Sequence, residues 1–191
     1  MRDLVIVGAG GHGREVLQLA RDINRQSPQW NVLGFVDDAY IEPRQVGDVP
    51  LLGALDWLAG QACSVVVAIG APAIRRRVVQ RLLALGTRDF ACLLHPSAIV
   101  GARVELGLGT IVCAGAVLTT DIILGEHVIV NTASVVSHDC RLADFVTLAP
   151  RVTLSGSASL AEGVEVGVAA AVMQGLSLEA WSKVGGGACV I

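Results

Sequence analysis

The stretch Val112-Cys-Ala-Gly-Ala-Val-Leu118-Thr-Thr-Asp-Ile-Ile-Leu124 shows the pattern that governs the C-terminal half of this chain. A large aliphatic residue recurs at every sixth position, and the residue two positions before it is never charged. The sixteen aliphatic positions are Val100, Leu106, Val112, Leu118, Leu124, Val130, Val136, Leu142, Leu148, Leu154, Leu160, Val166, Val172, Leu178, Val184 and Val190. A period of six predicts a hexapeptide parallel β-helix, in which each hexad forms one short strand and one corner. Three hexads close one coil, so residues 18 apart stack and the aliphatic ladders fill the interior.

The N-terminal half lacks this period and alternates apolar runs with helical patterns. The apolar, strand-like runs are residues 4–7, 32–36 and 65–70, and the helical patterns are residues 14–24 and 74–85. This alternation predicts an α/β domain with a small Rossmann-like parallel sheet covered by helices. We expect Arg75 and its neighbouring arginines to lie on the exposed face of the second helix. The predicted domains are a nucleotide-sugar-binding domain over 1–94 and a β-helix over 95–191.

A glycine-rich turn follows the first predicted strand and opens the first helix. Gly8, Gly10 and Gly13 fit the G-x-G-x-x-G spacing, in which the helix N-terminal amides attract a pyrophosphate. Asp37 and Asp38 follow the second strand at roughly the distance expected for ribose or base recognition. Fewer than 100 residues precede the coil, so one nucleotide fits this domain better than NAD. The alternative is that the glycines only make a tight turn and that Asp37 caps a loop.

His138 lies at a predicted corner of the coil, beside Asp139 and the interior residue Cys140. The 18-residue stacking places Thr120 on one side of His138 and Gly156 on the other. A glycine leaves space beside the imidazole and an unobstructed backbone N–H. A base that faces an amide donor is the minimum apparatus for acyl transfer, because the base takes a proton and the amide stabilises the oxyanion. The alternative is a solvated surface histidine.

The other three histidines give weaker signals. His127 is expected to be a surface residue without a chemical role, because its corner offers no carboxylate beyond Glu126. His95 precedes Pro96 and is expected at the domain junction. His12 lies inside the glycine turn, where a nucleotide contact and a simple role at the helix start are equally open.

Composition excludes several classes of protein. The chain is 53% hydrophobic but has only seven aromatic residues, which suits a narrow interior filled with Val, Leu, Ile and Ala. Charged residues interrupt every apolar run before the ~18 residues of a membrane-spanning helix, and the first residues lack signal-peptide features, so we expect a cytoplasmic protein. Five cysteines without a C-x-x-C pair argue against a disulfide framework and a metal site. A formal charge of −3 without a basic cluster argues against nucleic-acid binding.

Several segments together resemble the sugar O/N-acyltransferases of the sialic acid O-acetyltransferase type, which include nucleotide-amino-sugar N-acetyltransferases. The segments are Gly8-Ala-Gly-Gly-His-Gly13, Phe35-Val-Asp-Asp38, Ala68-Ile-Gly70, His95-Pro-Ser-Ala98, Asn131-Thr-Ala-Ser-Val-Val-Ser-His-Asp-Cys140 and Val184-Gly-Gly-Gly-Ala188. The similarity spans essentially the whole chain. It implies a left-handed β-helix, a homotrimer with active sites between neighbouring coils, and acetyl-CoA as the acetyl donor.

The resemblance also implies roles for individual residues. His138 would be the general base, Asp139 would orient it, and the Gly156 amide would hold the thioester oxygen. The residues implied to hold the nucleotide-sugar are Gly8, Gly10, Gly11, His12, Gly13, Asp37 and Asp38, and those implied to line the CoA groove are Val168 and Gly186. One departure is Thr147, which stands where many members carry a second histidine.

These observations predict an acetyl-CoA-dependent acetyltransferase that acts on the amine of a nucleotide-linked amino sugar by direct attack. An alkylammonium must lose a proton before it can attack, so a histidine is a suitable base. One rival is O-acetylation of a sugar such as a sialic acid, but Asp37 and Asp38 favour a nucleotide substrate because a free sugar needs no base-recognition site. The other rival is a non-catalytic nucleotide-sugar-binding trimer, which Thr147 favours and which His138 with Gly156 opposes.

Overall fold

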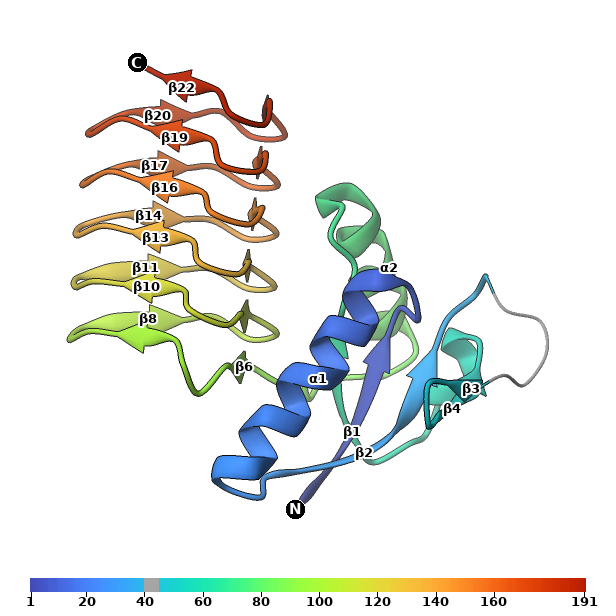
Figure 1. Cartoon of the computed structure of the whole chain (residues 1–191). Helices are drawn as coiled ribbons and strands as arrows, with labels where there is room; N and C mark the ends of the chain where they lie inside the picture. Colours follow the sequence, from blue (N-terminus) through green and yellow to red (C-terminus); the bar gives the residue numbers. More distant parts are fainter. Residues whose placement is uncertain (40–44) are drawn as a thin grey trace. The chain divides into compact units, whose positions relative to one another are not determined.

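The computed structural model describes residues 1–39 and 45–191, which form two compact units (Figure 1). One unit contains Met1–Gly70 and Ile74–Ala91, and the other contains Ala71–Ala73 and Cys92–Ile191. The first unit is an α/β domain and the second is a parallel β-helix. The fold class predicted from the sequence is therefore confirmed.

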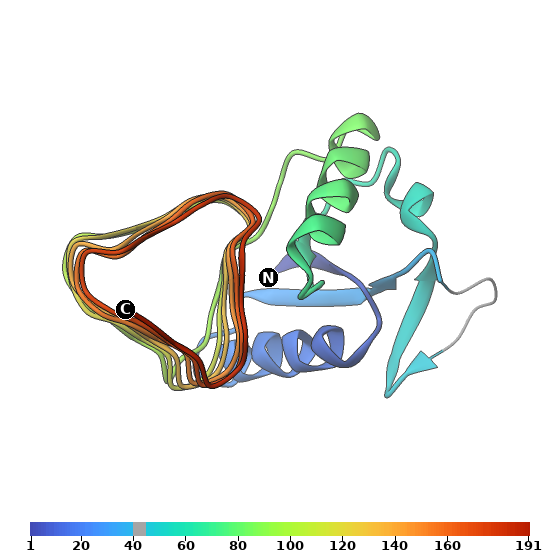
Figure 2. The same cartoon turned by 90° about the horizontal axis from the view of Figure 1, so that it is seen from above.

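A five-stranded sheet forms the centre of the first unit, in the order β3-β4-β2-β1-β5. Its parallel strands are β1 (Arg2–Val7), β2 (Trp30–Val36), β4 (Val49–Gly53) and β5 (Ser64–Val67), and the short edge strand β3 (Gln45–Val46) is antiparallel to β4. Figure 2 shows the helices α1 (Gly11–Gln26) and α2 (Pro72–Ala84) on opposite faces of this sheet. A 3-10 helix, η1 (Leu55–Leu58), follows β4. The strands β1 and β2 with α1 form one βαβ unit, and β5 with α2 adds a strand and a helix.

Arg75 on α2 corrects one expectation. We predicted an exposed arginine, but Arg75 is only 1% exposed. Its guanidinium donates hydrogen bonds to the carbonyl oxygens of Ile69 at 2.6 Å and Gly70 at 2.9 Å. These bonds satisfy carbonyl groups of the segment that leads from β5 into α2, which explains why the charge can be buried.

Three parallel sheets form the sides of the β-helix, and Figure 2 shows its triangular cross-section. Sheet 1 contains β7 (Ile99–Val100), β10 (Val117–Leu118), β13 (Val135–Val136), β16 (Thr153–Leu154), β19 (Ala171–Val172) and β22 (Cys189–Val190). Sheet 2 contains β8 (Val104–Leu106), β11 (Ile122–Leu124), β14 (Arg141–Leu142), β17 (Ser159–Leu160) and β20 (Ser177–Leu178). Sheet 3 contains β6 (Leu93–Leu94), β9 (Ile111–Val112), β12 (Ile129–Val130), β15 (Thr147–Leu148), β18 (Glu165–Val166) and β21 (Lys183–Val184).

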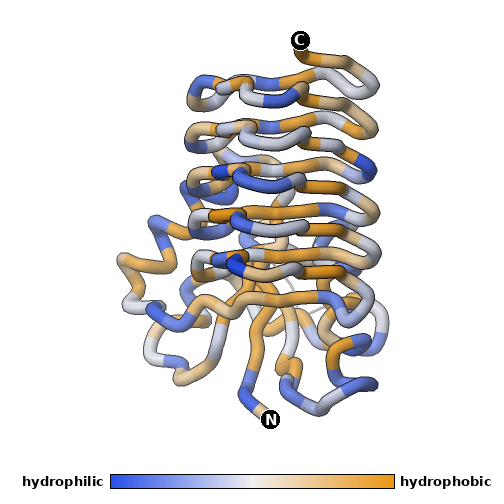
Figure 3. Tube along the Cα trace, turned by 90° about the vertical axis from the view of Figure 1, so that its left-hand side faces the viewer, coloured by the Kyte–Doolittle hydropathy of each residue, from blue (hydrophilic) through white to orange (hydrophobic). Residues whose placement is uncertain are grey.

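The register between coils follows the predicted spacing of 18 residues. Val117 pairs with Val135, and Ile129 pairs with Thr147. The aliphatic ladder from Val112 to Val172 is at most 2% exposed at every one of its positions. Figure 3 shows the same ladder as apolar bands that recur from coil to coil. Each fully buried aliphatic side chain contributes about 1.5–3 kcal/mol, so the interior holds the coils together without aromatic bulk.

The corners of the β-helix repeat one backbone conformation. A residue with a positive φ occurs at every sixth position from Arg103 to Gly187. Five of these fifteen positions are glycine; the others are Arg103, Asp121, His127, Ala133, Asp139, Phe145, Arg151, Ser157, Ala169 and Trp181. A left-handed conformation costs a non-glycine residue on the order of 1 kcal/mol, which the flanking ladders must offset. The corners therefore share their backbone and differ in their side chains.

Candidate active site

His138 lies at the corner between β13 of sheet 1 and β14 of sheet 2. Its side chain is 54% exposed, and its Nδ1 lies 2.8 Å from Oδ2 of Asp139. Asp139 holds the left-handed position of this corner, and its N–H donates to the carbonyl of Thr120. When Nδ1 donates its proton to the carboxylate, Nε2 carries the lone pair. The corner thus presents an accessible imidazole whose tautomer is set by a neighbouring carboxylate.

Gly156 lies against the imidazole of His138. A Cβ atom on Gly156 would lie 2.5 Å from Cε1 and 2.6 Å from Nε2 of His138, so any side chain there would displace the ring. The Gly156 carbonyl accepts the N–H of Gly175, and the His138 carbonyl accepts the N–H of Ser157. Within the described part of the chain, no backbone carbonyl accepts the N–H of Gly156. The structure therefore brings together His138, Asp139 and Gly156, with an amide donor beside the base.

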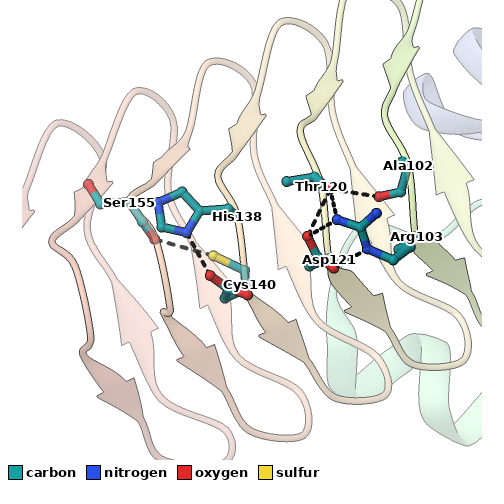
Figure 4. A network of polar contacts seen from close by, with 8 residues as sticks. Ala102, Arg103, Thr120, Asp121, His138, Cys140 and Ser155 are labelled. Atoms are coloured by element: carbon teal, nitrogen blue, oxygen red, sulfur yellow. Dashed lines mark hydrogen bonds and ion pairs between the residues drawn. The ribbon is translucent and has the colours of Figure 1, made fainter.

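A charged cluster that sequence reasoning missed lies in the preceding coil (Figure 4). The Arg103 guanidinium contacts both carboxylate oxygens of Asp121, with Nε to Oδ1 at 2.5 Å and Nη2 to Oδ2 at 2.7 Å. The Thr120 hydroxyl lies 2.9 Å from this carboxylate and 2.9 Å from the carbonyl of Ala102. The Arg103 hydrogen bond is the largest cause that lowers the pKa of Asp121 to about 2, followed by the Thr120 hydrogen bond. The 18-residue spacing of Arg103, Asp121 and Asp139 was the signal that could have revealed this cluster.

Cys140 is the interior neighbour of the site. Its thiol is fully buried and donates to the carbonyl of Ser155 at 3.2 Å, as Figure 4 shows. Burial raises its pKa, so the thiol stays protonated at neutral pH. Cys140 therefore packs under the corner and supplies no nucleophile.

His127 is not the solvated residue that we predicted. It lies at the corner between sheets 2 and 3 and is only 2% exposed. Its ring stacks on Phe145 with centroids 5.4 Å apart and planes inclined by 8°. A Cβ atom on Gly109 would lie 2.3 Å from its Nδ1. His127 thus lies in a buried stack between Gly109 and Phe145. Its burial depends on residues one coil away, which the residues next to it in the sequence do not reveal.

In the turn after β1, the backbone requires glycine at some positions and not at others. Gly8 has φ of 101°, a conformation that other residues rarely adopt. A Cβ atom on Gly13 would lie 2.0 Å from the Gly8 carbonyl oxygen, so only glycine allows α1 to pack this closely on β1. Cβ atoms on Gly10 and Gly11 would meet nothing within 4 Å, and no side chain caps this helix end. The turn therefore exposes uncapped backbone amides at a helix N-terminus, where an anion binds favourably.

The acidic end of β2 has structural partners. Asp37 accepts the N–H groups of Ala9 at 2.8 Å and Ala39 at 2.9 Å, so its carboxylate holds the glycine turn against β2. This arrangement matches the loop-capping alternative for Asp37, and it leaves further lone pairs for a ligand. Asp38 accepts the N–H of Leu55 at 3.0 Å and pairs with Arg81 at 2.5 Å.

Two further residues complete the surroundings of this turn. Arg81 extends from Asp38 to Asp56, which its Nη2 contacts at 2.8 Å. His12 is the second residue of α1, and its Nδ1 lies 3.0 Å from Oε2 of Glu15 one turn later. The seven residues predicted to hold the nucleotide-sugar are thus gathered around the turn and the end of β2.

Val168 and Gly186 occupy a different corner from His138. They stack in successive coils at the corner between sheets 3 and 1, where a Cβ atom on Gly186 would lie 3.3 Å from the Val168 carbonyl oxygen. Val168 is 54% exposed. His138 lies at the corner between sheets 1 and 2, so the two corners stand at opposite edges of sheet 1. Thr147 lies on β15 of sheet 3, which does not border the His138 corner.

The described residues hold neither a metal-binding group of side chains nor a membrane-spanning helix. Across residues 1–39 and 45–191, no three His, Cys, Asp or Glu side chains are grouped so that they could hold a metal ion. No helix in the same residues has the length and apolar character needed to span a membrane.

Comparison with known proteins identifies relatives of both units. A family model described as the PglD N-terminal domain matches residues 3–82. The whole chain is similar to perosamine N-acetyltransferase from Caulobacter crescentus, which was solved as a histidine-to-asparagine variant in complex with CoA and GDP-perosamine. The identity is 33% and the TM-score 0.90, over 99% of this chain and 88% of that chain.

Two other relatives agree with these matches. The acetyltransferase domain of PglB from Neisseria gonorrhoeae, solved in complex with acetyl coenzyme A, is 31% identical, with a TM-score of 0.86 over 99% of this chain and 92% of that one. UDP-N-acetylbacillosamine N-acetyltransferase from Bacillus subtilis is 36% identical over 126 residues. That match covers 60% of this chain and 52% of the relative, so the chain spans about half of this curated protein.

Proposed function

Because this chain belongs to the family of PglD-type nucleotide-amino-sugar N-acetyltransferases with a hexapeptide β-helix, we propose that it transfers the acetyl group of acetyl-CoA to the amine of a nucleotide-linked amino sugar. The observation that carries this proposal is the corner at His138, where an exposed imidazole rests on Gly156 and is held at Nδ1 by Asp139. Acetyl-CoA and nucleotide-sugars are cytoplasmic metabolites, so we place the protein in the cytoplasm.

The chemistry follows from the three residues at this corner. Nε2 of His138 takes a proton from the attacking amine, and the nitrogen forms a bond to the thioester carbonyl carbon. The Gly156 N–H donates to the oxygen that becomes negative, while Asp139 stabilises the imidazolium. Collapse of the tetrahedral intermediate breaks the carbon–sulfur bond, and the CoA thiolate takes the proton from Nε2. General-base catalysis supplies roughly 100- to 10,000-fold, and one oxyanion donor supplies roughly 100- to 1,000-fold.

The decisive experiment measures acetyl-CoA consumption with a panel of UDP-, GDP- and dTDP-linked amino sugars. We expect turnover with at least one of them and none with a free sialic acid, whose acetylation would support the rival O-acetyltransferase. Binding of a nucleotide-sugar without any consumption of acetyl-CoA would identify a non-catalytic binding protein instead.

The glycine turn is the site that we assign to the nucleotide. Uncapped amides of Gly10 and Gly11 fit a pyrophosphate. Asp37 holds the turn in place by accepting a hydrogen bond from the Ala9 N–H. We expect Asp37→Ala to weaken binding of the nucleotide-sugar roughly 10- to 150-fold, because hydrogen bonds to a charged group are lost. Acetyl-CoA affinity should stay unchanged in calorimetry. Equal loss for both ligands would mean that the variant is misfolded.

We also assign a homotrimer with shared sites. The corner with Val168 and Gly186 and the corner with His138 lie at opposite edges of sheet 1, so we assign the His138 that faces bound CoA to a neighbouring chain. A neighbouring chain can bring its own His138 corner to this groove. Light scattering should give a trimer at micromolar concentration, and a monomer would contradict the shared site.

Subunit mixing tests the sharing directly. His138→Ala and a Gly186→Asp variant should each be inactive alone, and trimers refolded from the mixture should regain part of the activity. No recovery in mixed trimers that bind both ligands would place both corners in one subunit.

A further inference from the structure

The corner of the preceding coil carries a charged pair that the proposed acetyl transfer does not use. Arg103, Asp121 and Asp139 occupy the same left-handed place in three successive coils, so their side chains leave the β-helix at equivalent points. Figure 4 shows the Arg103–Asp121 ion pair next to His138 along this edge. The order along the edge is a cation, an anion and then the His138–Asp139 pair.

The charges of this edge act on one another. Both carboxylate oxygens of Asp121 accept hydrogen bonds from Arg103, and Thr120 adds a third contact. Arg103 and Thr120 lower the pKa of Asp121 to about 2, with a smaller Coulomb contribution from His138. The Asp121 hydrogen bond is the largest cause that raises the pKa of Arg103, and Asp139 adds to it. Asp121 and His138 thus lie on neighbouring coils of the same edge, where their charges can interact.

On the other side of His138, the described residues of the next corner carry no charge. The following coil contributes Ser155, Gly156 and Ser157, which carry no ionisable side chain. Among the described residues of this edge, the charged groups are Asp139 on the corner of His138, Asp121 on the preceding coil and Arg103 one coil further.

We propose that Arg103 and Asp121 are positioning residues that adjust the proton affinity of His138 in opposite directions. The inference rests on the proposed function of His138 as the general base. Asp121 stabilises the positive charge that develops when Nε2 takes the proton of the substrate amine. Arg103 cancels part of this effect, so that His138 can release the proton to the departing CoA thiolate. Asp121 itself stays ionised and takes no proton.

The simpler alternative is that the ion pair only ties two coils together. Removal of either partner would then disturb the corner in the same way, and the two variants would behave alike. The electrostatic role demands opposite signs instead. Asp121→Asn leaves an unpaired cation near His138, whereas Arg103→Met leaves an unpaired anion.

The experiment compares pH profiles of kcat/KM. For Asp121→Asn we expect the acidic limb to move to lower pH by a few tenths of a unit, roughly the effect in water of one exposed charge on the neighbouring coil. For Arg103→Met we expect a similar move to higher pH. The double variant should return to the wild-type profile, and both single shifts should shrink in 1 M salt. Shifts of equal sign, or no shift in either single variant, would overturn the proposal.

Two further measurements separate this proposal from the proposed function. Matched controls are Arg21→Met and Asp48→Asn, which break an ion pair of the first unit in which Arg21 contacts both carboxylate oxygens of Asp48. Neither control should move the acidic limb of the pH profile. Titration of the His138 ring protons by NMR, identified by their loss in His138→Ala, needs no catalysis and should show the same opposite shifts. If His138→Ala retained full turnover while the ring titration still shifted, the assignment of the base would fail and the electrostatic coupling would stand.

Discussion

Two histidines of the β-helix lie at corners of similar backbone and have opposite surroundings. His138 rests on Gly156 of the following coil and is more than half exposed, whereas His127 rests on Gly109 of the preceding coil and is buried under Phe145. Both glycines lie 18 residues from their histidine. His127 itself occupies the left-handed place of its corner, whereas His138 precedes Asp139, which occupies that place. The place within the corner and the contacts to neighbouring coils together decide whether an imidazole is exposed or buried.

The sharpest test of this contrast is removal of each ring. His138→Ala should lower kcat roughly 100-fold or more and leave the melting temperature nearly unchanged, because an exposed base is lost. His127→Ala should do the reverse and destabilise the fold by about 2–4 kcal/mol, because a buried ring leaves a cavity. Steady-state kinetics and thermal unfolding of both variants check the prediction. Near-normal turnover of His138→Ala would end its assignment as the base.

A smaller effect is expected from adding one methyl group to each glycine. Gly156→Ala should lower kcat roughly 10- to 100-fold, because its Cβ would take the place of the His138 ring and displacements of about 1 Å can cost that much. Gly109→Ala meets the ring of His127 in the same way and should reduce stability without changing turnover per folded molecule. If both variants had the same kcat, the His138 corner would have no special role in turnover.

Asp139→Asn tests the carboxylate that only the His138 corner possesses. We expect kcat to fall about 10-fold, because the hydrogen bond at Nδ1 loses its charge while solvent competes at an exposed pair. KM should change little. A loss as large as that of His138→Ala would show that Asp139 acts in more than orientation.

The smallest expected effect concerns acid stability. Arg103 lowers the folded pKa of Asp121 from 3.8 to about 2, so the ionised carboxylate favours the folded state. This contribution is present above about pH 4 and is lost as the pH falls towards 2. Between pH 5 and pH 2.5, the melting temperature of Asp121→Asn should therefore fall less than that of the wild type. If the melting temperatures of both proteins fell by the same amount, the exposed pair would contribute nothing measurable to stability. The control is Phe145→Ala, which should lower the melting temperature equally at both pH values.

The β-helix could be predicted because its physics is periodic. Each interior position needs an aliphatic side chain, so the ladder from Val112 to Val172 was readable residue by residue, and the stacking distance placed Thr120 and Gly156 beside His138. The predicted α/β class of the first unit is also confirmed, although β3, β4 and η1 were not predicted. Their short runs around Gly47 and Gly53 have no clear period of their own.

The side-chain partners were harder to predict, because they depend on contacts between distant residues. The sequence pattern does not mark Arg75 as buried, since its bonds go to the carbonyl groups of Ile69 and Gly70 between β5 and α2. The burial of His127 depends on Phe145, one coil later. For Asp37 the sequence left ligand binding and loop capping open, and only the structure shows that its carboxylate accepts the N–H of Ala9. The catalytic and binding roles of the site residues remain predictions that the variants above address.

The left-handed corners, finally, tolerate substitution of their side chains. Because the ladders hold the bends, a corner accepts arginine, aspartate, histidine, phenylalanine, serine or tryptophan without a demand for glycine. Selection can therefore alter the outer edge of one coil while the interior of every coil stays as it is. New binding and catalytic properties can arise in small steps, each confined to one bend, and the same scaffold can diverge towards many substrates without refolding.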